Sequence, residues 1–126
     1  MVNRENNSLR IASGWMEKVV VIIGAFGVIL GAFGAHALKV NLEGTGNLDV
    51  WKTAVFYHLI HAVVLLVVTF SLKNFNKLSW FCFFTGIILF SGSLYLLALY
   101  QFAFLGPVTP LGGVLLIGGW LSLLRA

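Results

Sequence analysis

The chain alternates between long uncharged stretches and short segments that carry its charges. All Lys, Arg, Asp and Glu residues lie outside three uncharged stretches, which span residues 19–38, 53–72 and 78–124. A helix that crosses the bilayer needs about 20 predominantly apolar residues. The first two stretches therefore each predict one membrane-spanning helix.

The third stretch is long enough for two helices and is interrupted by Gly106-Pro107-Val108-Thr109-Pro110. We expect Thr109 to cap the second of these helices, with Pro110 at the first helical position, where a missing N–H costs nothing. The predicted helices cover residues 19–38, 54–72, 80–104 and 109–124. The predicted fold class is an all-α, integral membrane four-helix bundle, with a four-span domain over residues 19–126 after a cytoplasmic tail of residues 1–18.

Composition supports placement in a membrane. Hydrophobic residues make up 60% of the chain and charged residues only 10%, against roughly 25% charged residues in soluble domains. A charge at the centre of a span would cost about 2.5–3.5 kcal/mol. The absence of charge from every predicted span is what this cost demands.

The distribution of basic residues predicts the orientation. Six of the Lys and Arg residues fall on the side of the termini, and only Lys39 and Lys52 fall on the other side. The positive-inside rule then places both termini in the cytoplasm. The net charge of +4 reflects this topology, so no nucleic-acid partner is expected. Interfacial tryptophans are predicted near the inner ends for Trp15, Trp80 and Trp120, and near the outer end for Trp51.

Glycines recur at helical spacing in the first and last spans. They are Gly24, Gly27, Gly31 and Gly34 in the first helix and Gly112, Gly113 and Gly119 in the last. Helices associate in lipid where small residues let their backbones approach closely. The glycines therefore predict tight packing, either within one bundle or between copies. The expected partners are the lipid bilayer and either a second copy or another membrane protein.

Polar side chains gather in the predicted outer half of the bundle. They are His36, Tyr57, His58, His61, Ser91, Ser93, Tyr95 and Thr109. Ionisable residues inside a membrane are costly and are functional candidates for that reason.

Three interpretations of this cluster stay open. In the first, neutral imidazoles and hydroxyls tie the helices together, at about 0.6 kcal/mol per contact. In the second, His58 and His61 bind a metal or haem with His36 as a third ligand. In the third, the imidazoles relay protons or line a solute pathway.

An enzyme is the weakest interpretation. Activation of Ser91 or Ser93 by His61 would need an orienting acid, and the spans contain none. We therefore expect a non-enzymatic protein without a cofactor.

Several sequence phrases together resemble a known family. They are Gly31-Ala-Phe-Gly-Ala-His36-Ala-Leu38, Trp51-x-Thr-Ala-x-x-Tyr57 with His61-Ala62, Leu89-Phe-Ser-Gly-Ser-Leu-Tyr95, and Thr109-Pro-x-Gly-Gly113 with Gly119-Trp120. From about residue 19 onward the chain resembles the YgdD/YwdK-type family of small bacterial inner-membrane proteins.

The resemblance implies four helices in the bacterial inner membrane and no known function. It also implies a shared role for His36, Tyr57, His61, Ser91, Ser93, Tyr95, Thr109 and Pro110. The family usually has glutamine where this chain has His58, which weakens a metal site that relies on His58 and favours hydrogen bonding there. The resulting hypothesis is a membrane component whose polar cluster fixes helix packing or holds a small ligand or partner. The alternative is a histidine-based metal-binding or transport protein.

Overall fold

Four long helices dominate the computed structural model, which describes residues 12–70 and 75–125. They are α2 (Gly14–Ala35), α4 (Leu48–Phe70), α5 (Lys77–Tyr100) and α6 (Val108–Ser122). Short 3₁₀ turns flank α6 at Ala103–Leu105 (η1) and Leu123–Arg125 (η2). The four apolar segments run for 22, 23, 24 and 23 residues, the last counted with its 3₁₀ turns. Each is long enough to cross a bilayer. The predicted all-α bundle with four spans is confirmed.

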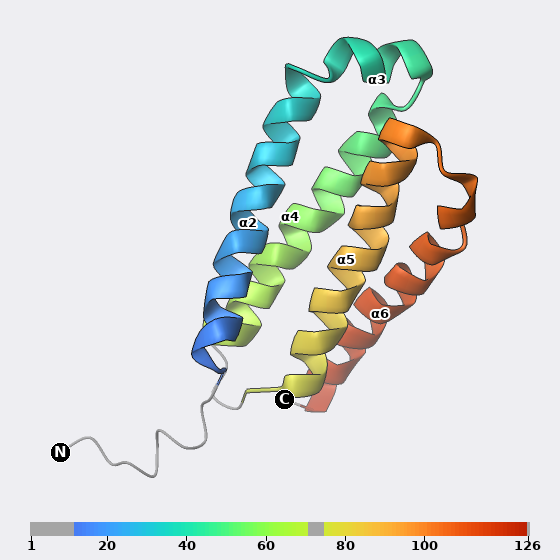
Figure 1. The fold of residues 1–126 in the computed structure, drawn as a ribbon. Coiled ribbons are helices and arrows are strands. Elements are labelled where there is room, and N and C mark those ends of the chain that lie inside the picture. The colour runs from blue at the N-terminus through green and yellow to red at the C-terminus, as the bar shows by residue number, and fades with distance from the viewer. Residues whose placement is uncertain (1–11, 71–74, 126) are drawn as a thin grey trace, which may run out of the picture.

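The four helices lie side by side in chain order (Figure 1). α2 packs on α4, α4 on α5, and α5 on α6, each pair antiparallel. A short helix, α3 (Lys39–Thr45), joins α2 to α4 at one end. We call this the α3 end. The opposite end, where α2 begins and η2 stops, is called the terminal end.

The helix boundaries differ from the predicted ones at the ends that carry charge. α2 begins at Gly14, so the predicted tail of residues 1–18 overlaps a helix; residues 1–11 lie outside the described part. α2 also stops at Ala35 rather than 38, and α4 begins at Leu48 rather than 54. The two earlier starts follow because charge excludes a residue from hydrocarbon but not from a helix, since backbone hydrogen bonds continue into the interface. α2 stops before any charge, where the backbone of His36 leaves helical geometry (φ −125°, ψ −81°). The predicted end of the second helix at residue 72 lies outside the described residues.

The third helix also begins and ends earlier than predicted. α5 begins at Lys77, because the Asn76 side chain accepts a hydrogen bond from the Ser79 N–H and caps the helix. It ends where Gln101 adopts a left-handed conformation (φ 56°).

The start of the last helix corrects the predicted cap. α6 begins at Val108, and the Thr109 hydroxyl pairs with Ser93 instead of capping the helix. Pro110 is consequently the third helical residue. The first four helical N–H groups have no intrahelical partner, so the proline still fits there.

Glycines allow neighbouring helices to approach closely. A Cβ atom at Gly112 would lie 2.7 Å from the Cα of Phe90, and one at Gly119 would lie 2.9 Å from the Phe83 ring. The α2 glycines face α4 in the pairs Gly27 with Leu59, Gly31 with Val55 and Gly34 with Trp51. An added Cβ atom would meet open space at Gly24 and would make only ordinary contact with the Phe90 ring at Gly113. Most of the predicted glycine seam is thus occupied by contacts within the chain.

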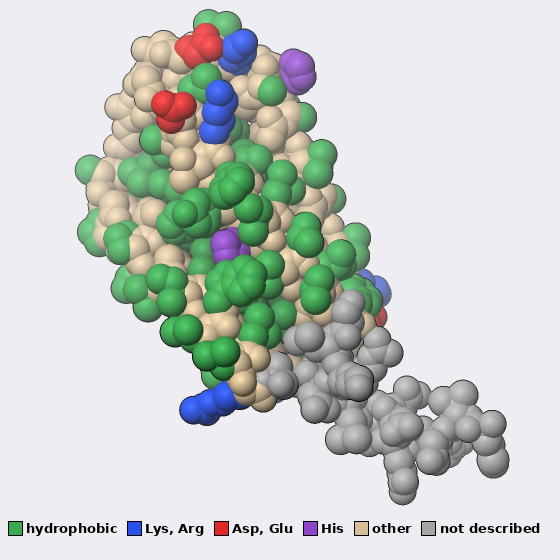
Figure 2. All heavy atoms as spheres, turned by 180° about the vertical axis from the view of Figure 1, so that it is seen from behind, with side chains coloured by type: hydrophobic (Ala, Val, Ile, Leu, Met, Phe, Trp, Pro, Cys, Tyr) green, Lys and Arg blue, Asp and Glu red, His purple; other side chains and the backbone are tan. Residues whose placement is uncertain are grey.

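The outer surface is apolar between two charged ends. Figure 2 shows hydrophobic side chains over the middle of one face, with charged side chains near the α3 end and the terminal end. Two of the tryptophans predicted near the span ends, Trp51 and Trp80, lie close to the starts of their helices and are also buried inside the bundle, at 2% and 0% exposed. Trp15 and Trp120 are about half exposed. Burial of the first two follows from protein acceptors for their N–H groups, described below.

Candidate functional site

The predicted polar residues form separate pairs rather than one cluster. Tyr95 pairs with His58, Ser93 pairs with Thr109, and Ser91 bonds a backbone carbonyl. His61 bonds the carbonyl of Tyr57, whose own side chain is partly exposed and packs on the rings of His61 and Phe90. His36 stands apart, exposed where α2 ends.

The two buried histidines lie further from the start of their helix than predicted. His58 and His61 follow Leu48, the first of 23 residues in α4, by ten and thirteen positions. At 1.5 Å per residue, His58 is about 15 Å along the helix, close to its midpoint. The earlier start of α4 accounts for this difference. Both side chains are only 6% exposed.

His58 bridges three helices. Its Nε2 lies 2.8 Å from the backbone oxygen of Ile23 in α2, and its Nδ1 lies 2.8 Å from the hydroxyl of Tyr95 in α5. A carbonyl only accepts, so Nε2 carries the proton and donates. In the neutral ring, Nδ1 accepts from Tyr95. The ring reaches the Ile23 carbonyl because Gly27, one turn later, has no side chain to cover it: a Cβ atom at Gly27 would lie 3.3 Å from the ring.

His61 is fixed in the opposite tautomer. Its Nδ1 lies 2.8 Å from the backbone oxygen of Tyr57, and its Nε2 accepts a hydrogen bond of 3.1 Å from the indole nitrogen of Trp120 in α6. The carbonyl requires a proton on Nδ1, and the indole N–H, a pure donor, requires a lone pair on Nε2. Both requirements are met only by the neutral ring. His61 thus joins α4 to α6 and has no nitrogen left over.

Trp51 repeats the arrangement of His58 two turns away. Its indole nitrogen donates to the backbone oxygen of Leu30 across 2.9 Å. Gly34 follows Leu30 by four residues, as Gly27 follows Ile23, and an added Cβ there would collide with the indole ring. The two donors are seven residues apart on α4, and their acceptors are seven apart on α2. The same contact therefore occurs twice between the antiparallel helices α2 and α4: a ring N–H of α4 donates to an α2 carbonyl that a glycine one turn later leaves uncovered.

Serine and threonine hydroxyls join the remaining helix pairs. Ser91 donates to the backbone oxygen of Ala54 across 2.8 Å, linking α5 to α4. Ser93 and Thr109 approach to 2.6 Å between α5 and α6, and Ser93 also lies 3.0 Å from the Phe90 carbonyl. Satisfied hydroxyls of this kind are common between membrane helices.

The predicted three-histidine metal set is not assembled. His58 contacts α2 at Ile23, whereas His36 follows Ile23 by thirteen residues. That separation is about 20 Å along a helix. Within residues 12–70 and 75–125, no group of three His, Cys, Asp or Glu side chains is close enough to hold one ion. All three histidines were predicted in the outer half of the bundle, whereas these contacts separate His36 from His58 along the helix axis.

A second polar group at the terminal end was not predicted. Asn76 donates to the backbone oxygen of Ser122 across 3.1 Å, and the hydroxyls of Ser79 and Ser122 also pair. Nearby, Trp80 donates to Thr69 across 3.0 Å. The sequence signal was available in Asn76, which precedes Ser79 by the spacing of a helix cap. These contacts fix the start of α5 against α4 and α6.

The chemistry of the site follows from this bonding. Among the described residues, every buried side-chain nitrogen and oxygen has a hydrogen-bond partner. The buried imidazole nitrogens are all engaged, which suits them to fixing helix positions. Four apolar spans joined by such pairs define a polytopic α-helical membrane protein.

Comparison with known proteins places the chain in a family. Residues 30–113 match the family described as "Protein of unknown function (DUF423)", and the chain belongs to it. It is 42% identical to the UPF0382 membrane protein YwdK of Bacillus subtilis over 119 residues, covering 86% of this chain and 95% of the relative. A UPF0382 membrane protein of Haemophilus influenzae is 41% identical over 108 residues, covering 83% and 86%. No solved structure matches the chain. The predicted resemblance is confirmed, as is membership of a membrane family without an established function.

Proposed function

We propose that this protein is a non-enzymatic component of the bacterial cell (inner) membrane whose buried polar pairs hold four helices in one arrangement. The main support for this proposal is the bonding of His61, whose two ring nitrogens are hydrogen-bonded to the Tyr57 carbonyl and the Trp120 indole. A general base or metal ligand needs a free lone pair, and this ring supplies none without losing a contact. The membrane-protein names of its bacterial relatives support the location.

The orientation belongs to the same proposal. Both termini face the cytoplasm, because six Lys and Arg residues lie on the side of the termini and only two lie on the opposite side. The α3 end then faces outward.

Metal analysis separates this proposal from a histidine-based metal or haem protein. The protein is purified in mild detergent without added metal, and bound metal is measured by mass spectrometry with an absorption spectrum alongside. We expect colourless, metal-free protein. Stoichiometric metal or haem that disappears in a His58→Ala, His61→Ala variant would overturn the proposal.

Thermal unfolding supplies the positive half of the test. His61→Ala leaves the Trp120 N–H without its acceptor and removes a contact between membrane helices that is worth about 0.6–1.7 kcal/mol. His36→Ala is the matched control, because His36 is exposed and unbonded through its side chain among the described residues. We expect a lower melting temperature for the first variant and no change for the second. A stable His61→Ala protein that has lost a cellular phenotype would point to a ligand instead.

A further inference from the structure

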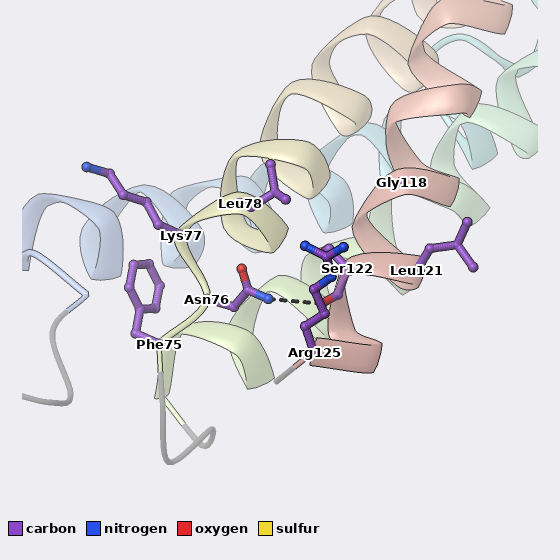
Figure 3. A pocket seen from close by; sticks show the side chains of 8 residues that line it. All are labelled: Phe75, Asn76, Lys77, Leu78, Gly118, Leu121, Ser122 and Arg125. Atoms are coloured by element: carbon purple, nitrogen blue, oxygen red, sulfur yellow. Dashed lines mark hydrogen bonds between the residues drawn. The ribbon is translucent and has the colours of Figure 1, made fainter.

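A hollow opens at the terminal end between the start of α5 and the end of α6. It measures about 750 Å³ and is walled by cationic Lys77 and Arg125, polar Asn76 and Ser122, and apolar Leu78 and Leu121. Figure 3 shows the α5 segment on one side of the space and α6 on the other, with Asn76, Ser122 and Arg125 between them, while the Lys77 and Leu121 side chains extend away from it. None of the contacts that join the buried histidines involves this hollow.

The frame of the hollow is fixed by hydrogen bonds. Asn76 donates to the backbone oxygen of Ser122, drawn as a dashed line in Figure 3. The hydroxyls of Ser79 and Ser122 pair alongside, and the Asn76 side chain also caps α5. The walls are therefore tied together before any ligand arrives.

Among the described residues, no acidic side chain offsets the positive charge of the hollow. Lys77 and Arg125 are both exposed, and no Asp or Glu lines the hollow in the part of the chain that the structure describes. In Figure 3 the Arg125 guanidinium turns back toward α6 and Leu78, while the Lys77 ammonium extends outward, so the two cations do not touch. An anion in the hollow would meet the Arg125 guanidinium, which binds phosphate through two parallel N–H bonds, and the exposed Lys77 side chain would turn from its outward orientation to reach the same anion.

The apolar walls identify the source of that anion. Leu78 and Leu121 are 62% and 60% exposed, on segments that are long and apolar enough to span a membrane. A free phosphate would gain nothing from these leucines. A phospholipid would place its charged headgroup against the cations and its acyl chains against the leucines. Basic pockets between membrane helices are known to take anionic lipid headgroups.

We propose that this hollow binds an anionic phospholipid, with its phosphate at Arg125 and Lys77 and its acyl chains along Leu78 and Leu121. The proposal rests on the position of the hollow at a membrane boundary and not on the packing role of the histidines. Its failure would therefore leave that role standing.

Native mass spectrometry of the full chain in detergent tests it, with phosphatidylglycerol and phosphatidylcholine as the probes. We expect the wild type to bind phosphatidylglycerol more tightly than the zwitterionic lipid. Each cation near an anionic lipid is worth about fivefold in affinity, so a Lys77→Gln, Arg125→Gln variant should lose about thirtyfold for phosphatidylglycerol. Equal affinity for the two lipids in the wild type would overturn the proposal.

Two variants separate a built site from general charge attraction. Lys39→Gln with Lys52→Gln makes the same change in net charge at the α3 end and should leave the affinity unchanged. Gly118→Leu keeps every charge and adds bulk at a residue that lines the hollow, where the only atom within 4 Å of an added Cβ is Cys82 Sγ at 3.9 Å. It should weaken binding while the melting temperature is retained.

Three further outcomes would overturn the proposal. The first is an equal loss of affinity in the α3-end control. The second is unchanged binding in a folded Gly118→Leu protein. The third is displacement of the lipid by inorganic phosphate at the same concentration, which would identify a free anion as the ligand.

Discussion

Trp120 donates its indole hydrogen bond to Nε2 of His61 across 3.1 Å, joining the two helices that lie on either side of α5. The bond requires His61 to be neutral, since a proton on Nε2 would face the indole N–H. Hydrogen bonds between membrane helices average about 0.6 kcal/mol and reach about 1.7 kcal/mol. The contact therefore stabilises the fold modestly, and it constrains the position of α6 relative to α4.

A double-mutant cycle measures this contact. Trp120→Phe and His61→Phe are made singly and together, and unfolding is followed by titration from mild detergent into a denaturing one. We expect a coupling energy of about 0.6–1.7 kcal/mol. Trp15→Phe with His61→Phe is the control, because Trp15 is similarly exposed and contacts Trp80 rather than His61. A coupling energy of zero in the Trp120 cycle would show that the His61–Trp120 hydrogen bond does not stabilise the fold.

Two adjacent glycines in α6 make a matched pair for packing. A Cβ atom at Gly112 would meet the backbone of Phe90 and lie 2.8 Å from the carbonyl carbon of Leu89, neither of which can turn away. At Gly113 the nearest atom is 3.6 Å away, on the Phe90 ring. We expect Gly112→Ala to destabilise the protein by about 1–3 kcal/mol or more. Gly113→Ala should leave the melting temperature nearly unchanged, and equal effects would argue against direct α5–α6 contact at Gly112.

The spans were predictable from the sequence because charge is excluded from hydrocarbon at a high cost. Helix ends were less predictable, since Gly14 and Leu48 begin helices that run through charged interfacial segments. The short helix α3 was missed for the same reason. A charged residue marks the edge of the lipid, and the backbone does not stop there.

The residue types of the site were predictable, but their partners were not. His58 and His61 are three residues apart on α4 and were placed together, yet one faces α2 and α5 and the other faces α6. Rotation of α4 against its neighbours decides this, and no local pattern specifies the rotation. The burial of Trp51 and Trp80 was not predicted because the acceptors of their N–H groups lie on neighbouring helices. Trp51 donates to Leu30 in α2, and Trp80 donates to Thr69 in α4.

Gly34 and Gly24 test the seam between α2 and α4. Gly34→Ala would drive a methyl group into the indole of Trp51 and break its bond to the Leu30 carbonyl. Because Trp51 is a rigid, buried ring, we expect a loss of about 1–3 kcal/mol, measured by unfolding in detergent. Gly24→Ala meets open space and gains up to about 1 kcal/mol of helix propensity. A protein indifferent to Gly34→Ala would contradict this packing of Trp51 on α2.

Cysteine labelling tests the proposed orientation with a second pair of glycines. Gly14 lies at the terminal end and Gly44 at the α3 end, and both have open space around an added Cβ. In a Cys82→Ser background, a membrane-impermeant maleimide added to intact cells, or to spheroplasts where an outer membrane is present, should label Gly44→Cys. It should label Gly14→Cys only after the membrane is opened. Both must react in detergent, which shows that each thiol is accessible.

The reverse labelling pattern would place both termini outside the cytoplasm and invert the positive-inside argument. The hollow beside Arg125 would then face the outer leaflet. Lipid binding measured with purified protein in detergent would not change, because that assay does not depend on orientation. Orientation and lipid binding are therefore separable, because the first depends on the distribution of basic residues along the chain and the second on two cations at one site. Loss of lipid binding with the expected labelling would instead leave Lys77 and Arg125 as topological signals alone.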